Sequence, residues 1–417
     1  MFLPHKYMEE NGSFLPLKGG YEISRFYTLV DALTNTSENQ NLDSWERFIT
    51  DTRTYRREGI FTPAVEDIIS HTMMSNDEKI LSLLKTYFEP DDYFLVYKRM
   101  IGTGCIGGKA CGMLLARKII QKDNPEAFAH MEPHDSYYLG SDVFYTYIVH
   151  NKFWRLHIHQ KTKQGYFKLA PQLEQAFLSG SFPEAIRLQF IRMLEYFGQR
   201  PIIVRSSSLQ EDAFGNAFAG KYESVFCINT GTMDERLTEL ENAVRTVYAS
   251  TMNTSALEYR RQRGLGFKDE QMALLIQRVS GSMYEDFLMP NAAGVGYSYS
   301  AYKWDDSIDA SDGMLRLVMG LGTRAVDRTE GDYPRIVNLS APERSTLTES
   351  WAKHQYSQRY VDLMDYTTKS LSSRPLKDVT PYMDSWYKKL VLEHDSDAER
   401  TFRERGQRRE ILFANCE

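Results

Sequence analysis

A cation follows a short apolar run near the middle of the chain, and three hydroxyl side chains come directly after it. Residues 202–204 have the length and branching of a buried strand, Arg205 follows them, and residues 206–208 are all serine. A guanidinium offers phosphate oxygens a planar fork of donors, and hydroxyl groups donate without adding charge. The stretch therefore predicts a loop that binds a polyphosphate.

The same stretch continues with two acids and a loop of small residues. Glu211 and Asp212 are adjacent, and the small residues that follow end at Gly220. Small side chains let backbone N–H groups approach a ligand closely. Alternating residues from 222 to 228 then predict a second strand. The alternative is a surface hairpin in which Arg205 pairs with one of the two acids.

A second glycine cluster precedes an apolar helical pattern. Gly102, Gly104 and Gly107 satisfy GxGxxG, residues 93–100 predict a strand before it, and Lys109 adds a charge where the helix begins. The cluster is not a Walker A loop, because it lacks that motif's first glycine and its magnesium-binding hydroxyl. A strand, this motif and a helix also suit a dinucleotide site, so a dinucleotide-binding oxidoreductase is one alternative.

Both motifs resemble one known family. VRSSSLQEDAFGNAFAGKYESVF, residues 204–226, is similar to a signature of the N-terminal nucleotide-binding domain of phosphoenolpyruvate synthase and pyruvate phosphate dikinase, and residues 107–109 match that family's GGK motif. The resemblance implies an α/β fold of the ATP-grasp type. It also implies that Lys109 and Arg205 contact the phosphates of ATP, with Mg²⁺ bridging the phosphate oxygens.

Further segments extend the resemblance to residues 93–340. MALLIQRV, residues 272–279, is similar to the family strand that lines the adenine pocket, and two glycines near residue 320 belong to a later turn. Two positions depart from the family, because Ser255 replaces an arginine and Thr323 replaces an acid. Arg245, Arg260 or Arg261 could replace the missing arginine. The resemblance implies these nucleotide-binding residues: Gly107, Gly108, Lys109, Arg205, Ser206, Ser207, Glu211, Gly220, Ser224, Gln277, Arg278, Val279, Gly320 and Gly322.

Three regions are expected. Residues 1–92 predict a helical accessory region, and residues 93–340 the nucleotide-binding domain, with subdomains at 93–200 and 201–340. Alternation through residues 143–147 predicts a strand in the first subdomain. Residues 341–417 predict a helical extension, truncated before the family's metal-ligand strand.

Composition limits the class of partner. The 417 residues carry a net charge of −6 with 25% charged and 42% hydrophobic residues, so no global basic field indicates nucleic acid or an anionic membrane. The four cysteines lack CxxC spacing, and no apolar run reaches membrane-spanning length. The pattern favours a cytoplasmic protein, and it does not indicate an oligomeric state.

The family resemblance implies a phosphotransferase that passes phosphate from Mg-ATP to a histidine on a separate swivelling domain. The acceptor stays open between pyruvate, glucan and a small molecule. The family's metal-binding glutamate strand has no match between residues 339 and 417, where acids such as Glu393, Asp395, Asp397 and Glu399 fall in a mixed-charge helical pattern. We therefore expect a chain that binds ATP without completing the reaction alone, as the front part of a longer enzyme. The alternative is a non-catalytic nucleotide sensor.

Overall fold

The structure, a computed structural model, describes residues 5–8, 13–16, 44–57, 61–210, 220–266, 268–303, 306–326, 331–344, 347 and 349–415. These residues combine helices with several β-sheets, so the fold is mixed α/β, as predicted. The chain divides into two compact units, residues 1–278 and 279–417, and each is described by itself. The predicted boundaries at residues 92 and 340 stay predictions.

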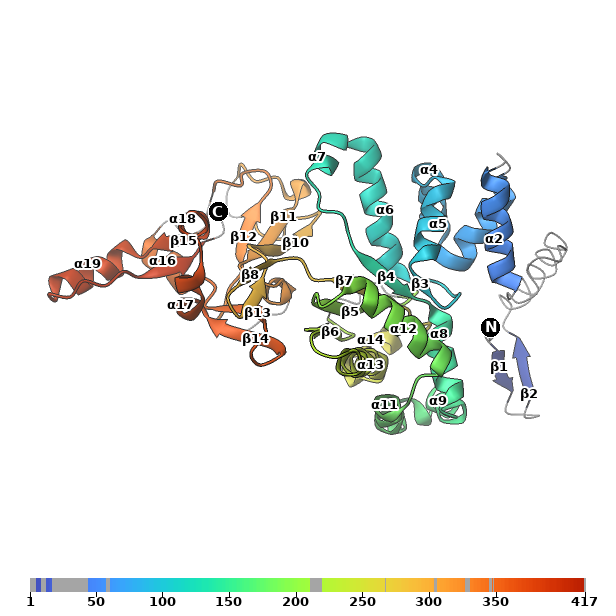
Figure 1. Cartoon of the computed structure of the whole chain (residues 1–417). Helices are drawn as coiled ribbons and strands as arrows, with labels where there is room; N and C mark the ends of the chain where they lie inside the picture. Colours follow the sequence, from blue (N-terminus) through green and yellow to red (C-terminus); the bar gives the residue numbers. More distant parts are fainter. Residues whose placement is uncertain are drawn as a thin grey trace. The chain divides into compact units, whose positions relative to one another are not determined.

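A five-stranded sheet forms the centre of the first unit (Figure 1). The strands lie in the order β3-β4-β7-β5-β6; β3 and β4 are parallel, and all other neighbours are antiparallel. Their bounds are β3 (Met100–Ile101), β4 (Ser136–Leu139), β5 (Ile202–Ser206), β6 (Ser224–Cys227) and β7 (Leu274–Arg278). The predicted strands at 202–204, 222–228 and 272–279 are therefore all present, and β7 lies between β4 and β5.

Helices cover both faces of this sheet (Figure 1). Side chains alternate along a strand, so Leu275 of β7 packs with α2–α6, whereas Leu274 and Ile276 pack with the helices from α8 to α14. The elements before the sheet are β1 (His5–Met8), β2 (Ser13–Pro16), α2 (Ser44–Arg57), α3 (Pro63–Ile69), η2 (Ser70–Met74), α4 (Glu78–Tyr87) and α5 (Pro90–Lys98). The later helices are α6 (Gly108–Asp123), α7 (Pro125–Ala129), α8 (Ser141–His150), α9 (Trp154–Gln160), α10 (Gly165–Lys168), α11 (Ala170–Ser179), α12 (Glu184–Phe197), α13 (Met233–Ser250) and α14 (Thr254–Gln262).

Two strand predictions in this unit are wrong. Residues 93–98 belong to α5, which starts with a capping box between Glu89 and Asp92 and a proline at its first turn. Residues 143–147 belong to α8, whose side chains are buried almost all around. A helix without a polar face has no 3.6-residue hydrophobic period, so alternating tyrosines there imitate a strand.

Antiparallel sheets and short helices build the second unit. One sheet has the order β10-β11-β12, another has β14-β13-β9-β8, and β15 pairs with β16. The strands are β8 (Ser282–Tyr284), β9 (Phe287–Met289), β10 (Ala293–Tyr297), β11 (Met314–Val318), β12 (Arg335–Asn338), β13 (Tyr360–Asp365), β14 (Ser370–Pro375), β15 (Leu392–His394) and β16 (Leu412–Ala414). The helices are η3 (Ala310–Asp312), α15 (Thr323–Val326), α16 (Ser350–Gln355), α17 (Leu376–Val379), η4 (Thr380–Tyr382), α18 (Ser385–Val391) and α19 (Ser396–Glu404).

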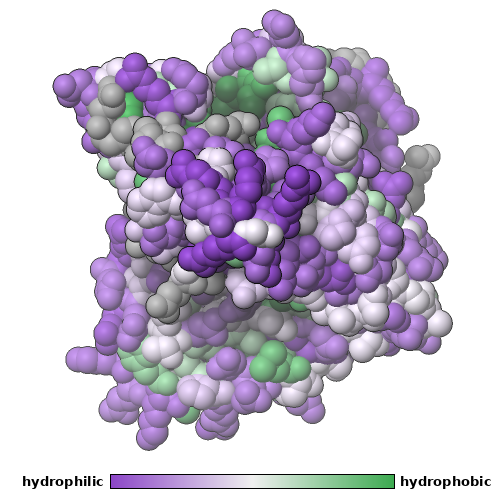
Figure 2. Space-filling model, turned by 90° about the vertical axis from the view of Figure 1, so that its left-hand side faces the viewer, coloured by the Kyte–Doolittle hydropathy of each residue, from purple (hydrophilic) through white to green (hydrophobic). Residues whose placement is uncertain are grey.

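The segment after residue 341 contains strands that the sequence analysis did not predict. The hairpin β13–β14 is antiparallel, with Asp362 opposite Ser373, and Glu393 lies in β15 rather than in a helix. Val361, Leu363 and Met364 of β13 are fully buried, because β13 lies inside its sheet. On the face of the molecule shown in Figure 2, hydrophilic residues dominate and apolar residues form separate small groups.

Candidate functional site

Two loops that are about 100 residues apart in the sequence are joined by hydrogen bonds. The hydroxyl of Ser207 donates to the carbonyl of Ile106 at 2.9 Å and accepts from the amide of Ala110 at 3.0 Å. The amide of Gly108 donates to the carbonyl of Ser208 at 3.1 Å. The start of α6 and the end of β5 therefore form one structure, as expected if both motifs serve one site.

Gly107 makes this approach possible. Its φ is +84°, and a Cβ built on it would lie 1.3 Å from the carbonyl oxygen of Ser207. A left-handed φ already favours glycine, and the neighbouring backbone leaves no room for any side chain. The second residue of the predicted GGK motif, Gly108, opens α6 and presents Lys109 in its first turn.

The two predicted phosphate-binding cations lie in this joined structure. The Lys109 ammonium donates to the hydroxyl of Ser206 at 3.2 Å. Arg205, the residue before Ser206 on β5, donates to the Gln277 side-chain oxygen at 3.4 Å. The structure thus brings Lys109, Arg205, Ser206 and Gln277 together, and the two cations are each half-buried.

Gln277 is fixed from two further sides. Its amide nitrogen contacts the Ser136 hydroxyl on β4 and the Met113 sulfur on α6, each at 3.2 Å. Met113 lies one helical turn after Lys109. Gln277 therefore links the strand that ends the first unit to the helix that carries the lysine.

The carboxylate of Asp142 accepts hydrogen bonds from the first amides of the glycine loop. Its carboxylate accepts from the amide of Thr103 at 3.0 Å and from the amide of Gly104 at 2.7 Å. Burial raises the pKa of Asp142, while these bonds favour the charged form. The loop holds an internal carboxylate where a dinucleotide fold would present these amides to a pyrophosphate. Sequence reasoning missed this residue, because it lies 38 positions beyond Gly104.

A buried carboxylate, that of Glu270, accepts a hydrogen bond from the serine loop. Glu270 is hydrogen-bonded by the hydroxyl of Ser208 and, at 2.7 Å, by that of Tyr222. The guanidinium of Arg260 lies 3.3 Å from the same carboxylate, and both residues are buried. Arg260, one candidate for the missing family arginine, is thus paired inside the first unit. Glu270 is a second residue that sequence reasoning missed.

The other two candidate arginines also have partners. Arg245 pairs with Glu241 at 3.0 Å and donates to the carbonyl of Gly180 at 2.8 Å. The guanidinium carbon of Arg261 lies 4.8 Å from the ring centroid of Phe167.

The remaining predicted residues fall in three places. Ser224 is opposite Arg205 in the β5–β6 pair, and Gly220 has a left-handed φ of +67°. Arg278 pairs with Glu132 at 2.5 Å. Glu211 lies outside the described residues. The second unit contains Val279, Gly320 and Gly322; a Cβ on Gly320 would lie 2.5 Å from a methyl of Val361.

Four carboxylates in the second unit are bonded to two arginines. Arg324 donates to Asp362 at 2.9 Å and also pairs with Asp332, while Thr323 donates to the other oxygen of Asp362 at 2.5 Å. Arg374 pairs with Asp365 at 2.8 Å and with Asp286 at 3.1 Å. Within the described ranges, no group of three or more His, Cys, Asp or Glu is placed to hold a metal ion. These carboxylates therefore do not fit a resident divalent cation.

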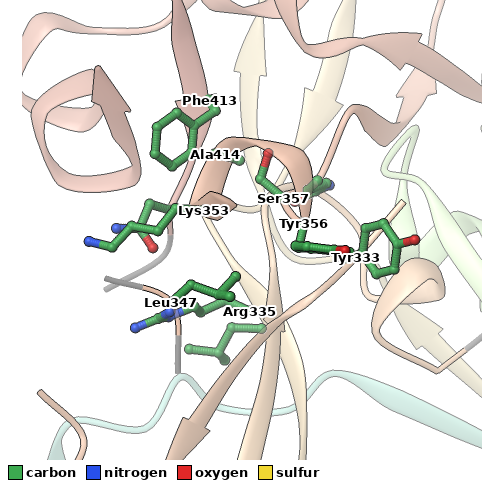
Figure 3. Close-up of a pocket in the computed structure, with 11 residues that line it drawn as sticks. Tyr333, Arg335, Leu347, Lys353, Tyr356, Ser357, Phe413 and Ala414 are labelled. Carbon is green, nitrogen blue, oxygen red and sulfur yellow. The ribbon is translucent and has the colours of Figure 1, made fainter. Parts of the chain in front are cut away.

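A small pocket in the second unit is lined by two tyrosines and two cations (Figure 3). The rings of Tyr333 and Tyr356 meet edge to face at 5.3 Å, and Lys353 pairs with Glu393 at 3.3 Å. The cavity is about 30 Å³, the share of one water molecule in the liquid. This pocket is too small for a ligand of nucleotide size.

Comparison with known proteins identifies the central part of the chain. The family model of the pyruvate phosphate dikinase AMP/ATP-binding domain matches residues 103–380, about two thirds of the chain. The match includes both loops of the site and reaches beyond residue 340, through the hairpin β13–β14. A search of curated proteins found no match. Among the described residues, no helix is both long and apolar enough to cross a membrane.

Proposed function

Because this chain belongs to the family of the pyruvate phosphate dikinase AMP/ATP-binding domain, we propose that Lys109 and Arg205 bind the phosphates of ATP. The contact between the Lys109 ammonium and the Ser206 hydroxyl, directly beside Arg205, is the observation that supports this assignment. Two half-buried cations and a hydroxyl on adjoining loops offer several charge-assisted donors to one polyphosphate.

The base would lie along the end of β7. In this proposal, residues 277–279 supply backbone contacts and apolar walls to adenine, as the resemblance implies. Gln277 is held by Arg205, Ser136 and Met113, so the strand end is positioned before the nucleotide arrives. Ser207, Gly220 and Ser224 would complete the site on the first unit. The roles of Gly320 and Gly322, which lie in the second unit, stay predictions of the resemblance.

Magnesium would enter with the nucleotide. Asp332 and Asp362 are bonded to Arg324, and Asp286 and Asp365 to Arg374, so the phosphate oxygens themselves are the ligands that we propose for Mg²⁺. Bound there, the ion supplies neutralisation of phosphate charge. The protein's own contribution is to orient the phosphates through Lys109, Arg205 and Ser206.

The reaction of this family suggests a phosphotransferase. We propose that a histidine on a separate swivelling domain accepts the phosphoryl group, and that the protein works in a reducing compartment such as the cytoplasm. Cys105, Cys111 and Cys227 are buried free thiols, which is compatible with such a compartment.

A non-catalytic nucleotide-binding domain is the second candidate. The observation in its favour is that both acidic side chains of β13 described above, Asp362 and Asp365, are bonded to arginines. A regulatory domain needs the phosphate and base contacts but no carboxylate to hold a metal.

Titration calorimetry tests the binding proposal. ATP with Mg²⁺ should bind, ADP should bind through the same residues, and NAD should not compete with ATP. Displacement of ATP by equimolar NAD would restore the dinucleotide alternative that rests on Gly102, Gly104 and Gly107. A protein that binds none of the three nucleotides would contradict the assignment as a whole.

A further inference from the structure

The first unit contains a cavity of its own, lined by residues of α5, α6 and α7 and of the start of β4. Figure 1 shows where these elements lie. The volume of the cavity is about 330 Å³, within the range of small-molecule pockets and equal to roughly ten water molecules in the liquid. Neither Lys109 nor Arg205 lines it, and Ser136, which also contacts Gln277, lies between the two sites. The two cations that we propose for the phosphates of ATP therefore do not belong to this cavity.

Apolar and aromatic side chains form most of the walls. Phe88, Val96, Leu114 and Tyr138 line the cavity and are buried from solvent by their surroundings. Phe128 of α7 lines it as well. Walls of this kind favour a ligand with an apolar or aromatic body.

Two of the three Arg and Lys side chains that line the cavity are paired with its two carboxylates. Asp92 pairs with Lys118 at 2.6 Å, and Asp135 pairs with Arg99 at 3.5 Å. No ion pair is found for the remaining cation, Arg117, among the described residues. A ligand that enters the cavity therefore meets two neutralised acids and one arginine with its charge still to be balanced.

Two other residues that line the cavity, Phe128 and His134, lie near the guanidinium of Arg117. Its guanidinium carbon lies 5.5 Å from the ring centroid of Phe128. Burial, together with the charge of Arg117, lowers the pKa of His134, which also lines the cavity. His134 is therefore neutral at pH 7 and does not compete with Arg117 for an anion.

We propose that this cavity is a binding site for a small organic anion, whose apolar or aromatic body fills the space and whose carboxylate binds Arg117. The guanidinium matches a carboxylate in a planar, two-bonded geometry. Arg117 lies two turns after Lys109 on α6, so the helix joins this site to the other over roughly 12 Å.

Fluorine NMR with 4-fluorobenzoate as the probe tests the proposal, with 4-fluorobenzyl alcohol as the neutral comparison. The benzoate should bind, the alcohol should bind at least about tenfold more weakly, and Arg117→Gln should weaken the benzoate by a similar factor. Leu95→Trp, at an exposed lining position of α5, should fill the cavity and abolish binding. Lys122→Gln removes a cation from the same helix outside the cavity and should change nothing.

Three results would overturn the proposal. The first is that the benzoate does not bind at millimolar concentration, and the second is that the Arg117→Gln variant binds it as tightly as the wild type. The third is that ATP displaces the benzoate, which would place the benzoate in the nucleotide site. Thermal unfolding of each variant shows whether it is folded. Leu95→Trp changes an exposed residue, and Arg117→Gln removes the guanidinium but keeps a polar side chain. The proposal therefore requires weaker binding in both variants while both are folded.

Discussion

Gly107 determines whether the two loops of the site can meet at all. Its left-handed φ and its contact with the carbonyl of Ser207 both exclude a side chain. The carbonyl belongs to the backbone, so it cannot move aside without shifting the end of β5. A substitution here therefore acts on the serine loop as well as on the helix that follows.

We predict that Gly107→Ala lowers the free energy of unfolding by about 2 kcal/mol or more, because strain and overlap add. Gly112→Ala, in the interior of the same helix with open space around its Cα, should raise it by about 0.5–1 kcal/mol. Urea unfolding of the two variants checks both signs. Equal stability of the two variants would show that the loops meet in some other way.

We predict that Lys109→Ala and Arg205→Ala each weaken ATP binding by about 1.5–3 kcal/mol, the usual effect of removing a charge-assisted contact. Calorimetry with Mg-ATP measures the change. Lys118→Ala, on the same helix, and Arg192→Ala, an exposed arginine of α12, are the matched controls and should bind normally. Unchanged affinity in both site variants would show that the phosphates lie elsewhere.

At the scale of single elements, the hairpin β13–β14 depends on the ion pairs of one arginine. Arg374 bonds Asp365 on the neighbouring strand and Asp286 just before β9. These bonds lower the pKa of Asp286; burial alone would raise the pKa of Asp365, but Arg374 and two loop amides hold it below its usual value. A lowered carboxyl pKa stabilises the fold above the ordinary value, near 3.9, and that stability is lost as the pH falls through the lowered pKa.

The stabilising effect of Arg374 should therefore depend on pH. Arg374→Gln should lower the unfolding temperature of the second unit by about 2–4 °C at pH 7, and the difference from wild type should shrink as the pH falls below 4. Arg400→Gln breaks an exposed pair with Asp397 and should change neither value. A difference that persists unchanged down to pH 2 would contradict the role of the two carboxylates.

Local patterns predicted the elements that carry the site, but not the groups that support it. The strand predicted at residues 202–204, which continues as β5 to Ser206, and the helix that begins at Gly108 are both present. Each is encoded by neighbouring residues. Asp142 and Glu270 could not be found this way, because each acts on a loop tens of residues away and an isolated acid has no periodic signal.

Two helices were predicted as strands, each because its local pattern does not show a helical period. Apolar residues on every side of α8 remove the contrast between faces, and the short apolar run of α5 fits either type of element. The nucleotide motifs were recognised because they combine residue types with fixed spacing, which tertiary packing does not change.

At the scale of the whole molecule, we predict that the chain binds Mg-ATP without forming AMP and phosphate on its own. The reaction that we propose needs a histidine acceptor on another domain, and the described carboxylates of β13 are bonded to arginines. Chromatography of nucleotides after incubation with ATP and Mg²⁺, with and without pyruvate, measures the products. Robust AMP formation would show that the metal ligands or the acceptor have been misplaced.

The bonds of the Ser207 hydroxyl couple nucleotide binding to hydrogen exchange at a backbone amide. Because the amide of Ala110 donates to the Ser207 hydroxyl, we expect it to exchange with solvent when the start of α6 separates from the end of β5. The same opening separates Lys109 from Arg205, because each lies beside one of the two joined loops. ATP at 100 times its dissociation constant should then slow exchange at Ala110 by the full binding term, about 2.7 kcal/mol, or roughly a hundredfold.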